Sequence, residues 1–292
     1  MKPRFSVLTT CVISAFLLCM ATATTSFSAF SGSDDLTVQE IIAKHVDSIG
    51  TAEARAAVKS RVIFGTAVVT FRIGGTGHGE GSAVLASQGN SSLFGIAFNS
   101  LEYPRENLGF DGTKLTAADV TPGIRSTLGN FFMAHEMPFR EGLMEGALSA
   151  AWPLLDLSTR KASLKYDGNK KIDGRKVHIL RYEAKNDSGL KTKLYFDAET
   201  FRHVRTEYEK RTVQQMANQP GVTQQQGDSI TKLVEEFSDF KTENGLMLPH
   251  SYKVQLSIET LNRRALQDWA FTLSRFVFNK TLEQKQFDVT AN

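Results

Sequence analysis

Apolar and polar residues along this chain first follow a helical period and then a strand period. Thr37-Val38-Gln39-Glu40 has the capping-box pattern that starts a helix. The positions that follow recur at a spacing of three and four residues up to Gly50, which can take the left-handed cap conformation: Val38, Ile41, Ile42, His45, Val46 and Ile49. We expect an amphipathic helix over 38–49 and a short alanine-rich helix over 51–59.

Alternation with a period of two begins after Arg61. It predicts strands over 62–73, 79–87, 92–98 and 106–110, a tight turn at Asp111-Gly112, and further strands over 176–184, 190–196, 201–210, 230–240, 249–260 and 269–278. Tyr252, Val254, Leu256 and Ile258 alternate with polar residues, which gives this segment one dry and one wet face. Repeated two-faced strands indicate an antiparallel sheet with a solvated outside.

Two segments break this alternation. Residues 122–152 predict two or three short helices with a high density of large apolar side chains: Phe131, Phe132, Met133, Phe139, Leu143, Met144 and Leu148. These side chains either form plain core or cover the open side of a curved sheet. The glutamine-rich stretch 212–228 predicts a polar loop between two strands.

The N-terminus has the three-part layout of a secretory signal peptide. Lys2 and Arg4 precede an apolar run over 7–20 and small residues over 21–23. We expect cleavage after Ala23, with Ala29 as the alternative, because the apolar run is shorter than the roughly 20 residues that span a bilayer. The prediction is a periplasmic protein with a signal peptide at 1–23, a flexible linker at 24–35 and a single domain at 36–292.

Composition narrows the function classes. Both cysteines, Cys11 and Cys19, lie in the predicted signal peptide, so the remainder can form no disulfide. Leu18 before Cys19 disfavours lipid attachment there. Loss of Lys2 and Arg4 reduces the formal net charge from +3 to about +1, which gives no strong attraction to nucleic acid. No later segment is long and apolar enough for a transmembrane helix, so we do not expect an integral membrane protein.

Four motifs in the second half resemble those of a known superfamily. They are Leu194 to Thr200, Phe237 to Lys241, Asn244 to Pro249, and Phe276 to Asn279. Together with the order of elements, they are similar to the periplasmic lipoprotein carriers LolA, LolB and their relatives. Each motif also has a structural meaning, since Asp197 to Thr200 and Asn244-Gly245 can turn hairpins and Pro249 can begin an edge strand.

The resemblance implies a mainly β (α+β) fold: a curved antiparallel sheet that forms an incomplete barrel around a few helices and holds acyl chains in an apolar cavity. The implied ligand-binding residues are Ile63, Val69, Phe71, Leu194, Phe196, Val254, Leu256 and Ile258 in the cavity wall or core, and Phe131, Phe132 and Met133 in a lid. Arg61 and Arg72 are the candidates for the family's gating arginine. Sequence leaves open whether the half-barrel interior is a cavity or a filled core.

Candidate chemistry is sparse. The six histidines, at positions 45, 78, 135, 178, 203 and 250, are scattered, and no metalloprotease helix, nucleophile elbow or phosphate loop occurs. His45 lies on the apolar stripe of the first predicted helix, and this position predicts that it is a buried, hydrogen-bonded histidine of the core. His78 and Glu80 share a strand face without a third ligand, and one of Glu235 and Glu236 should face the interior. We therefore predict no catalysis, no cofactor and no metal.

Three function classes remain. The first is a non-catalytic periplasmic carrier or binding protein for an acyl chain, lipid or lipoprotein in envelope trafficking, with an envelope protein as a further candidate partner. The alternative is an envelope scaffold or sensor module, with a solidly packed half-barrel that acts through an edge strand or the polar loop. A hydrolase is the third class, and it requires a compact cluster of polar side chains in a cleft.

Overall fold

The computed structural model describes residues 36–75, 77–157, 159–186, 189–212, 228–262 and 264–290. These residues belong to one compact unit, Leu36–Asn292. The predicted signal peptide, the linker and residues 213–227 of the predicted polar loop lie outside the described residues.

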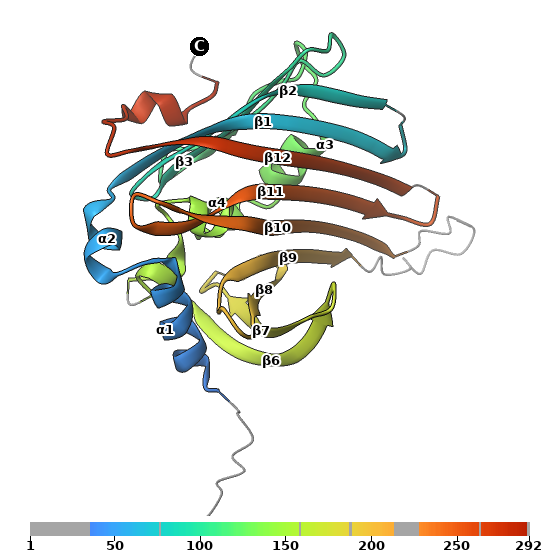
Figure 1. Cartoon of the computed structure of the whole chain (residues 1–292). Coiled ribbons are helices and arrows are strands. Elements are labelled where there is room, and N and C mark those ends of the chain that lie inside the picture. The colour runs from blue at the N-terminus through green and yellow to red at the C-terminus, as the bar shows by residue number, and fades with distance from the viewer. Residues whose placement is uncertain are drawn as a thin grey trace, which may run out of the picture. The chain divides into compact units, whose positions relative to one another are not determined.

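Twelve strands form one antiparallel sheet in the order β5-β4-β3-β2-β1-β12-β11-β10-β9-β8-β7-β6. Their bounds are β1 Ser60–Ile73, β2 Gly77–Gln88, β3 Ser91–Phe98, β4 Arg105–Phe110, β5 Leu115–Ala117, β6 Ser163–Ile172, β7 Arg175–Glu183, β8 Lys191–Asp197, β9 His203–Thr212, β10 Ser229–Glu243, β11 Leu246–Glu259 and β12 Arg264–Phe278. The sheet curves strongly and stays open, because its edge strands β5 and β6 do not pair (Figure 1). The predicted fold class, an incomplete antiparallel barrel around a few helices, is confirmed.

The predicted alternation decides which side chains face inward. On β1, Ile63, Ala67 and Val69 are buried on the concave face, while Val68 and Arg72 are exposed on the outer face. Pro249 lies in β11 where only β10 pairs with it, since pairing with β12 begins at Ser251. Proline has no N–H to donate, so a position with one neighbouring strand accommodates it.

The helices are short, and most lie on the concave side of the sheet. Their bounds are α1 Val38–Ile49, α2 Ala52–Ala57, α3 Thr127–Ala134, α4 Met137–Arg140, and the 3-10 helices η1 Gly146–Leu148, η2 Pro153–Leu155 and η3 Gln284–Phe287. The capping box at α1 is confirmed: the Glu40 N–H donates to Thr37 Oγ1 at 3.2 Å, and the Thr37 N–H donates to the Glu40 carboxylate at 2.8 Å. We call residues 122–157 the helical cover; α3 and α4 lie within it, inside the curve of the sheet (Figure 1).

The predictions missed β5 and β6 and made one element, the second helix, too long. β6 is an edge strand whose residues are mostly exposed on both faces, so it carries no apolar alternation. β5 has only three residues. The helix predicted over 51–59 is shorter because Thr51 is its N-cap and Val58 is already extended.

A C-terminal strap, which we define as residues 279–290, crosses the outer face of the sheet. Phe287 lies directly over Gly109 of β4, where an added Cβ would stand 2.2 Å from the Phe287 carbonyl oxygen. The Val289 N–H donates to Thr116 Oγ1 at 3.1 Å, and the Gln284 side-chain amide bonds to Ser91 and to the Asp111 carbonyl. This face of β3 to β5 is therefore covered by the chain itself.

We expect Gly109→Ala to displace the strap, because its methyl group would overlap backbone that cannot move without breaking these bonds. Overpacking of this kind lowers the free energy of unfolding by about 1–3 kcal/mol. Urea denaturation measures the loss, and limited proteolysis should cleave the strap sooner. Gly75→Ala is the matched control, because the nearest atom to its added Cβ is 3.6 Å away. Equal stability of the two variants would contradict the strap's tight seating.

Candidate functional site

The concave face holds most of the ligand-binding residues predicted from sequence. Six of the eight wall residues are almost fully buried, and Phe71 and Ile258 are partly buried; all eight belong to or pack on one apolar cluster: Ile63, Val69, Phe71, Leu194, Phe196, Val254, Leu256 and Ile258. Their role as ligand contacts stays a prediction. Their placement together on the inner face follows from strand parity.

The lid residues divide. Phe131 and Phe132 are buried, whereas Met133 is 41% exposed and lies outside the cluster. The buried stripe of α3 consists of Leu128, Phe131 and Phe132, and helical geometry turns the next residue away from it. Met133 therefore does not face the interior with its two neighbours, and its role in the lid stays a prediction.

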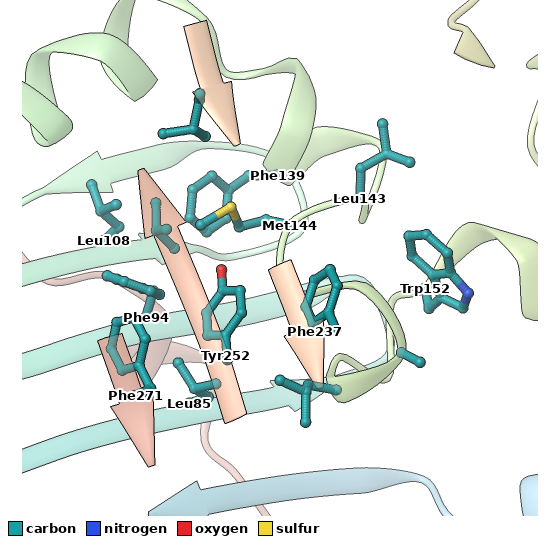
Figure 2. Packing of buried hydrophobic residues seen from close by; sticks show 14 of the residues in the cluster. Leu85, Phe94, Leu108, Phe139, Leu143, Met144, Trp152, Phe237, Tyr252 and Phe271 are labelled. Carbon is teal, nitrogen blue, oxygen red and sulfur yellow. The ribbon is translucent and has the colours of Figure 1, made fainter. Parts of the chain in front are cut away.

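Side chains from the helical cover fill the interior. Phe139 and Met144 of the cover lie close to Tyr252 of the sheet, and Trp152 of the cover lies beyond Phe237; all of them are nearly inaccessible to solvent (Figure 2). Such interdigitation at the density of a protein core leaves no room for a ligand while the cover stays in place. In this structure the half-barrel interior is a filled core.

A buried carboxylate connects the cover to three neighbouring strands. Glu235 of β10 is fully buried and accepts from the Tyr252 hydroxyl at 2.7 Å, the Tyr208 hydroxyl at 2.8 Å and the Glu145 N–H at 2.8 Å. Burial raises its pKa from 4.5 to about 7. The prediction that one of Glu235 and Glu236 faces the interior is confirmed, and the interior carboxylate has its partners.

Glu145, at the other end of one of these bonds, is unusual in two ways. Its backbone is left-handed, with φ of 69°, and its side chain is buried with no hydrogen-bond partner for Oε1 among the described residues. Burial, and secondly the Glu235 carboxylate, raise its pKa well above the ordinary range. Such surroundings favour the protonated form of Glu145. No pattern in the sequence predicted that this side chain would be buried.

Arg61 ties the cover to β1 from the opposite side. Its guanidinium is 2% exposed and donates to the backbone carbonyls of Ala147 and Ser149, the latter at 3.4 Å. No carboxylate lies within ion-pair distance among the described residues, Nε has no partner, and burial lowers its pKa to about 10. Arg72, the other candidate for a gating arginine, pairs with Asp268 on the outer face. Of the two, only Arg61 contacts the cover.

Glu106 anchors the start of α3 in the same manner. It is buried, accepts from Ser126 Oγ at 2.8 Å and from the Tyr103 hydroxyl, and its pKa is raised to about 7 by burial. Ser126 is the N-cap of α3, and its Oγ also accepts from the Gly129 N–H at 2.7 Å. The strand parity of β4 places Glu106 inward, a signal that sequence reasoning missed.

His45 is a core histidine, as predicted. Its Nδ1 bonds to the Phe201 carbonyl at 3.0 Å and its Nε2 to the Trp152 indole N–H at 2.9 Å. One ring nitrogen donates and the other accepts, so the neutral ring satisfies both contacts. Burial lowers its pKa to about 4. His203 stacks on the other side of Trp152, at 4.7 Å between ring centroids.

The arrangement holds the cover in place. The polar groups around Glu235 are buried beneath the cover rather than open to a cleft. His78 and Glu80 are exposed on β2, and no group of three or more potential metal ligands occurs in the described ranges. No helix among these residues is long and apolar enough to cross a membrane.

Comparison with solved structures finds similar folds. A LolA superfamily protein from Nitrosomonas europaea is 13% identical, with 87% of this chain and 99% of that chain covered and a TM-score of 0.45. A putative outer membrane lipoprotein-sorting protein domain from Vibrio parahaemolyticus is 11% identical, with coverage of 85% and 98% and a TM-score of 0.41. The Mycobacterium tuberculosis lipoprotein LppX is 12% identical, with coverage of 85% and 99% and a TM-score of 0.24.

These similarities concern the fold alone. No protein-family model matches the chain. No curated protein matches it either.

Glu235 should make stability depend on pH. Because its folded pKa is raised from 4.5 to about 7, its contribution is complete below pH 4.5 and falls as pH rises through 7. Glu235→Gln cannot ionise and keeps an acceptor oxygen. We expect the wild-type stability relative to this variant to fall by on the order of 2–3 kcal/mol between pH 5 and pH 8.

Urea denaturation at the two pH values measures this difference. Glu236→Gln is the matched control, because its carboxylate lies on the outer face beside Arg205. A wild-type curve that stays parallel to that of Glu235→Gln across the range would show that Glu235 does not titrate as described.

Proposed function

We propose that this chain is a non-catalytic carrier or binding protein of the periplasm that takes an acyl chain or lipid on the concave face of its half-barrel. The helical cover is the lid, and it occupies the ligand's place in this structure. The predicted signal peptide supports the compartment. The contact of Arg61 with the cover is the observation that carries the proposal.

A buried guanidinium without a carboxylate partner carries a large desolvation penalty, so it stabilises the contact between two parts of a protein poorly. Desolvation of a charge costs several kcal/mol, and apolar side chains of similar volume stabilise an interior at least as well. Arg61 stands at the contact between sheet and cover and bonds only to backbone carbonyls there. Such bonds are directional and break when the cover moves, so they suit a closure that opens better than a permanent core.

Many of the remaining contacts between sheet and cover are apolar, as contacts with an acyl chain would be. Phe139 and Met144 present apolar surface to the concave face, and an acyl chain in their place would cover the same strands. Each methylene buried there contributes about 0.8 kcal/mol. Withdrawal of the cover would therefore expose a site that a single long chain can fill without polar partners.

The filled interior favours a second candidate function. If the cover never withdraws, the half-barrel is a solid scaffold, and the chain acts through contacts with another envelope protein. The dense packing around Trp152 and Tyr252 is the observation that supports this alternative. The two functions differ in whether the concave face ever becomes accessible.

Fluorescent fatty-acid binding separates them. We expect dansyl-undecanoic acid to bind the purified chain at about one molecule per protein. Arg61→Leu should raise the apparent affinity about tenfold. Leu is smaller than Arg and leaves the Ala147 and Ser149 carbonyls without their donor, which costs the closed form about 1–3 kcal/mol and increases the open fraction to which the probe binds. Arg72→Leu is the matched control and should bind as the wild type does, since Arg72 pairs with Asp268 outside.

Absence of binding in all three proteins would move the assignment to the scaffold. Binding that is equal in wild type and Arg61→Leu would support a lipid site but remove Arg61 from its closure. Circular dichroism of each variant establishes that the fold is retained.

A further inference from the structure

The outer face of the sheet has two halves of different character. Over β9 to β12, charged side chains pair across strands, as in Lys232 with Glu207, and at the border of this half Asp268 of β12 pairs with Arg72 near the end of β1. Arg205 likewise pairs with Glu236. These pairs give a solvated surface with its charges matched, which is the ordinary condition of an outward sheet face.

Over β1 to β4, the outward positions are mostly small or apolar. Strand register places Arg275, Phe64, Val84, Gly95 and Asn107 in one row across β12, β1, β2, β3 and β4. The next row ends with Ala97 beside Arg105. Cross-strand neighbours on one face lie within contact distance, so each row is a continuous strip.

These strips form the floor of a groove of about 640 Å³. It is lined by Phe64, Val84, Gly95, Ala97, Arg105 and Asn107, among others. Gly95 keeps the floor low, because a Cβ there would meet Val84 at 3.0 Å. A second hollow shares Val84, Gly95, Arg105 and Asn107 and is bounded by the C-terminal strap at Lys285 and Asp288.

One arginine, Arg105, lines the groove, and a second, Arg275, stacks on Phe64 at its other side. Arg105 lies on β4 and Arg275 on β12, and the Arg275 guanidinium is 4.0 Å from the centre of the Phe64 ring. Both are exposed, and no carboxylate lies within ion-pair distance of either among the residues that the structure describes. The groove therefore offers an apolar floor between two cations that are free to pair with an incoming anion.

We propose that this groove binds an extended, acidic segment of a partner protein, with apolar or small residues between two acidic positions. The two arginines lie four strand spacings apart, about 19 Å, which an extended chain covers in about six residues. A lipid carries its charge at one end and would meet only one of them. The site is on the face opposite the helical cover, so a partner can reach it without the concave face opening.

A labelled peptide tests the proposal. The probe has eight residues, two aspartates at each end and alternating valine and threonine between them, and its binding to the full chain is followed by fluorescence anisotropy. We expect saturable binding below about 1 mM that weakens at high salt, because exposed charges are screened. Arg105→Glu with Arg275→Glu should weaken it at least about tenfold.

The control is Lys171→Glu with Lys191→Glu, which makes the same charge change at exposed positions of β6 and β8 and should leave binding within about twofold. Thermal melting of each variant establishes folding, and Arg105→Glu alone, which leaves the Phe64 stack in place, should give part of the loss. Equal binding of a peptide with lysines at its ends, or no binding of the acidic peptide, would overturn the proposal. Binding to phosphatidylglycerol vesicles without binding of the peptide would also overturn it and assign the surface to lipid.

Discussion

The structure depends on ionisable side chains that face the interior of an apolar half-barrel. Arg61, Glu106 and Glu235 project from the concave face, and each finds a hydrogen-bond partner in the helical cover. A buried polar group without a partner costs roughly 1–3 kcal/mol, and more if it is charged. The sheet and its cover therefore require each other. The sheet supplies buried ionisable side chains that need hydrogen-bond partners. The cover supplies backbone carbonyls, a backbone amide and the hydroxyl of a helix N-cap, which need partners as well.

Strand parity explains how much of this could be predicted from sequence. Alternation along 62–73 and 249–260 was enough to place Ile63, Val69, Val254 and Leu256 on one buried face, and the same alternation put one carboxylate of Glu235-Glu236 inside. Parity of β4 would have found Glu106 too. Alternation of apolar and polar residues is absent where a strand is exposed on both faces. For this reason the sequence did not predict β6 as a strand.

The partners of the buried charges could not be predicted. Arg61 bonds a carbonyl 86 residues away in sequence, and Glu235 bonds an amide 90 residues away. Those pairings arise from the path of an irregular segment, residues 140–152, which has no period to read. Glu145 is the clearest example. Its left-handed backbone and its buried carboxyl group accompany the hydrogen bond to Glu235, and no feature of the neighbouring sequence predicts them. Met133 is a separate case: it stands in the same apolar run as Phe131 and Phe132, and the face of a short helix decides its exposure.

The same parity separates two surfaces with different uses. Odd-numbered residues of β1 meet the cover, whereas even-numbered residues such as Phe64 line the outer groove beside the C-terminal strap. A ligand on one face therefore need not compete with a partner on the other. The two are nevertheless joined by β1, since Arg61, which holds the cover, is three residues from Phe64 on the same strand. The register between β1 and β12 shifts at Phe64/Gly65. If movement of the cover altered the backbone of β1 there, the shape of the groove would change as well. A single strand is therefore the physical route by which the two faces can be coupled.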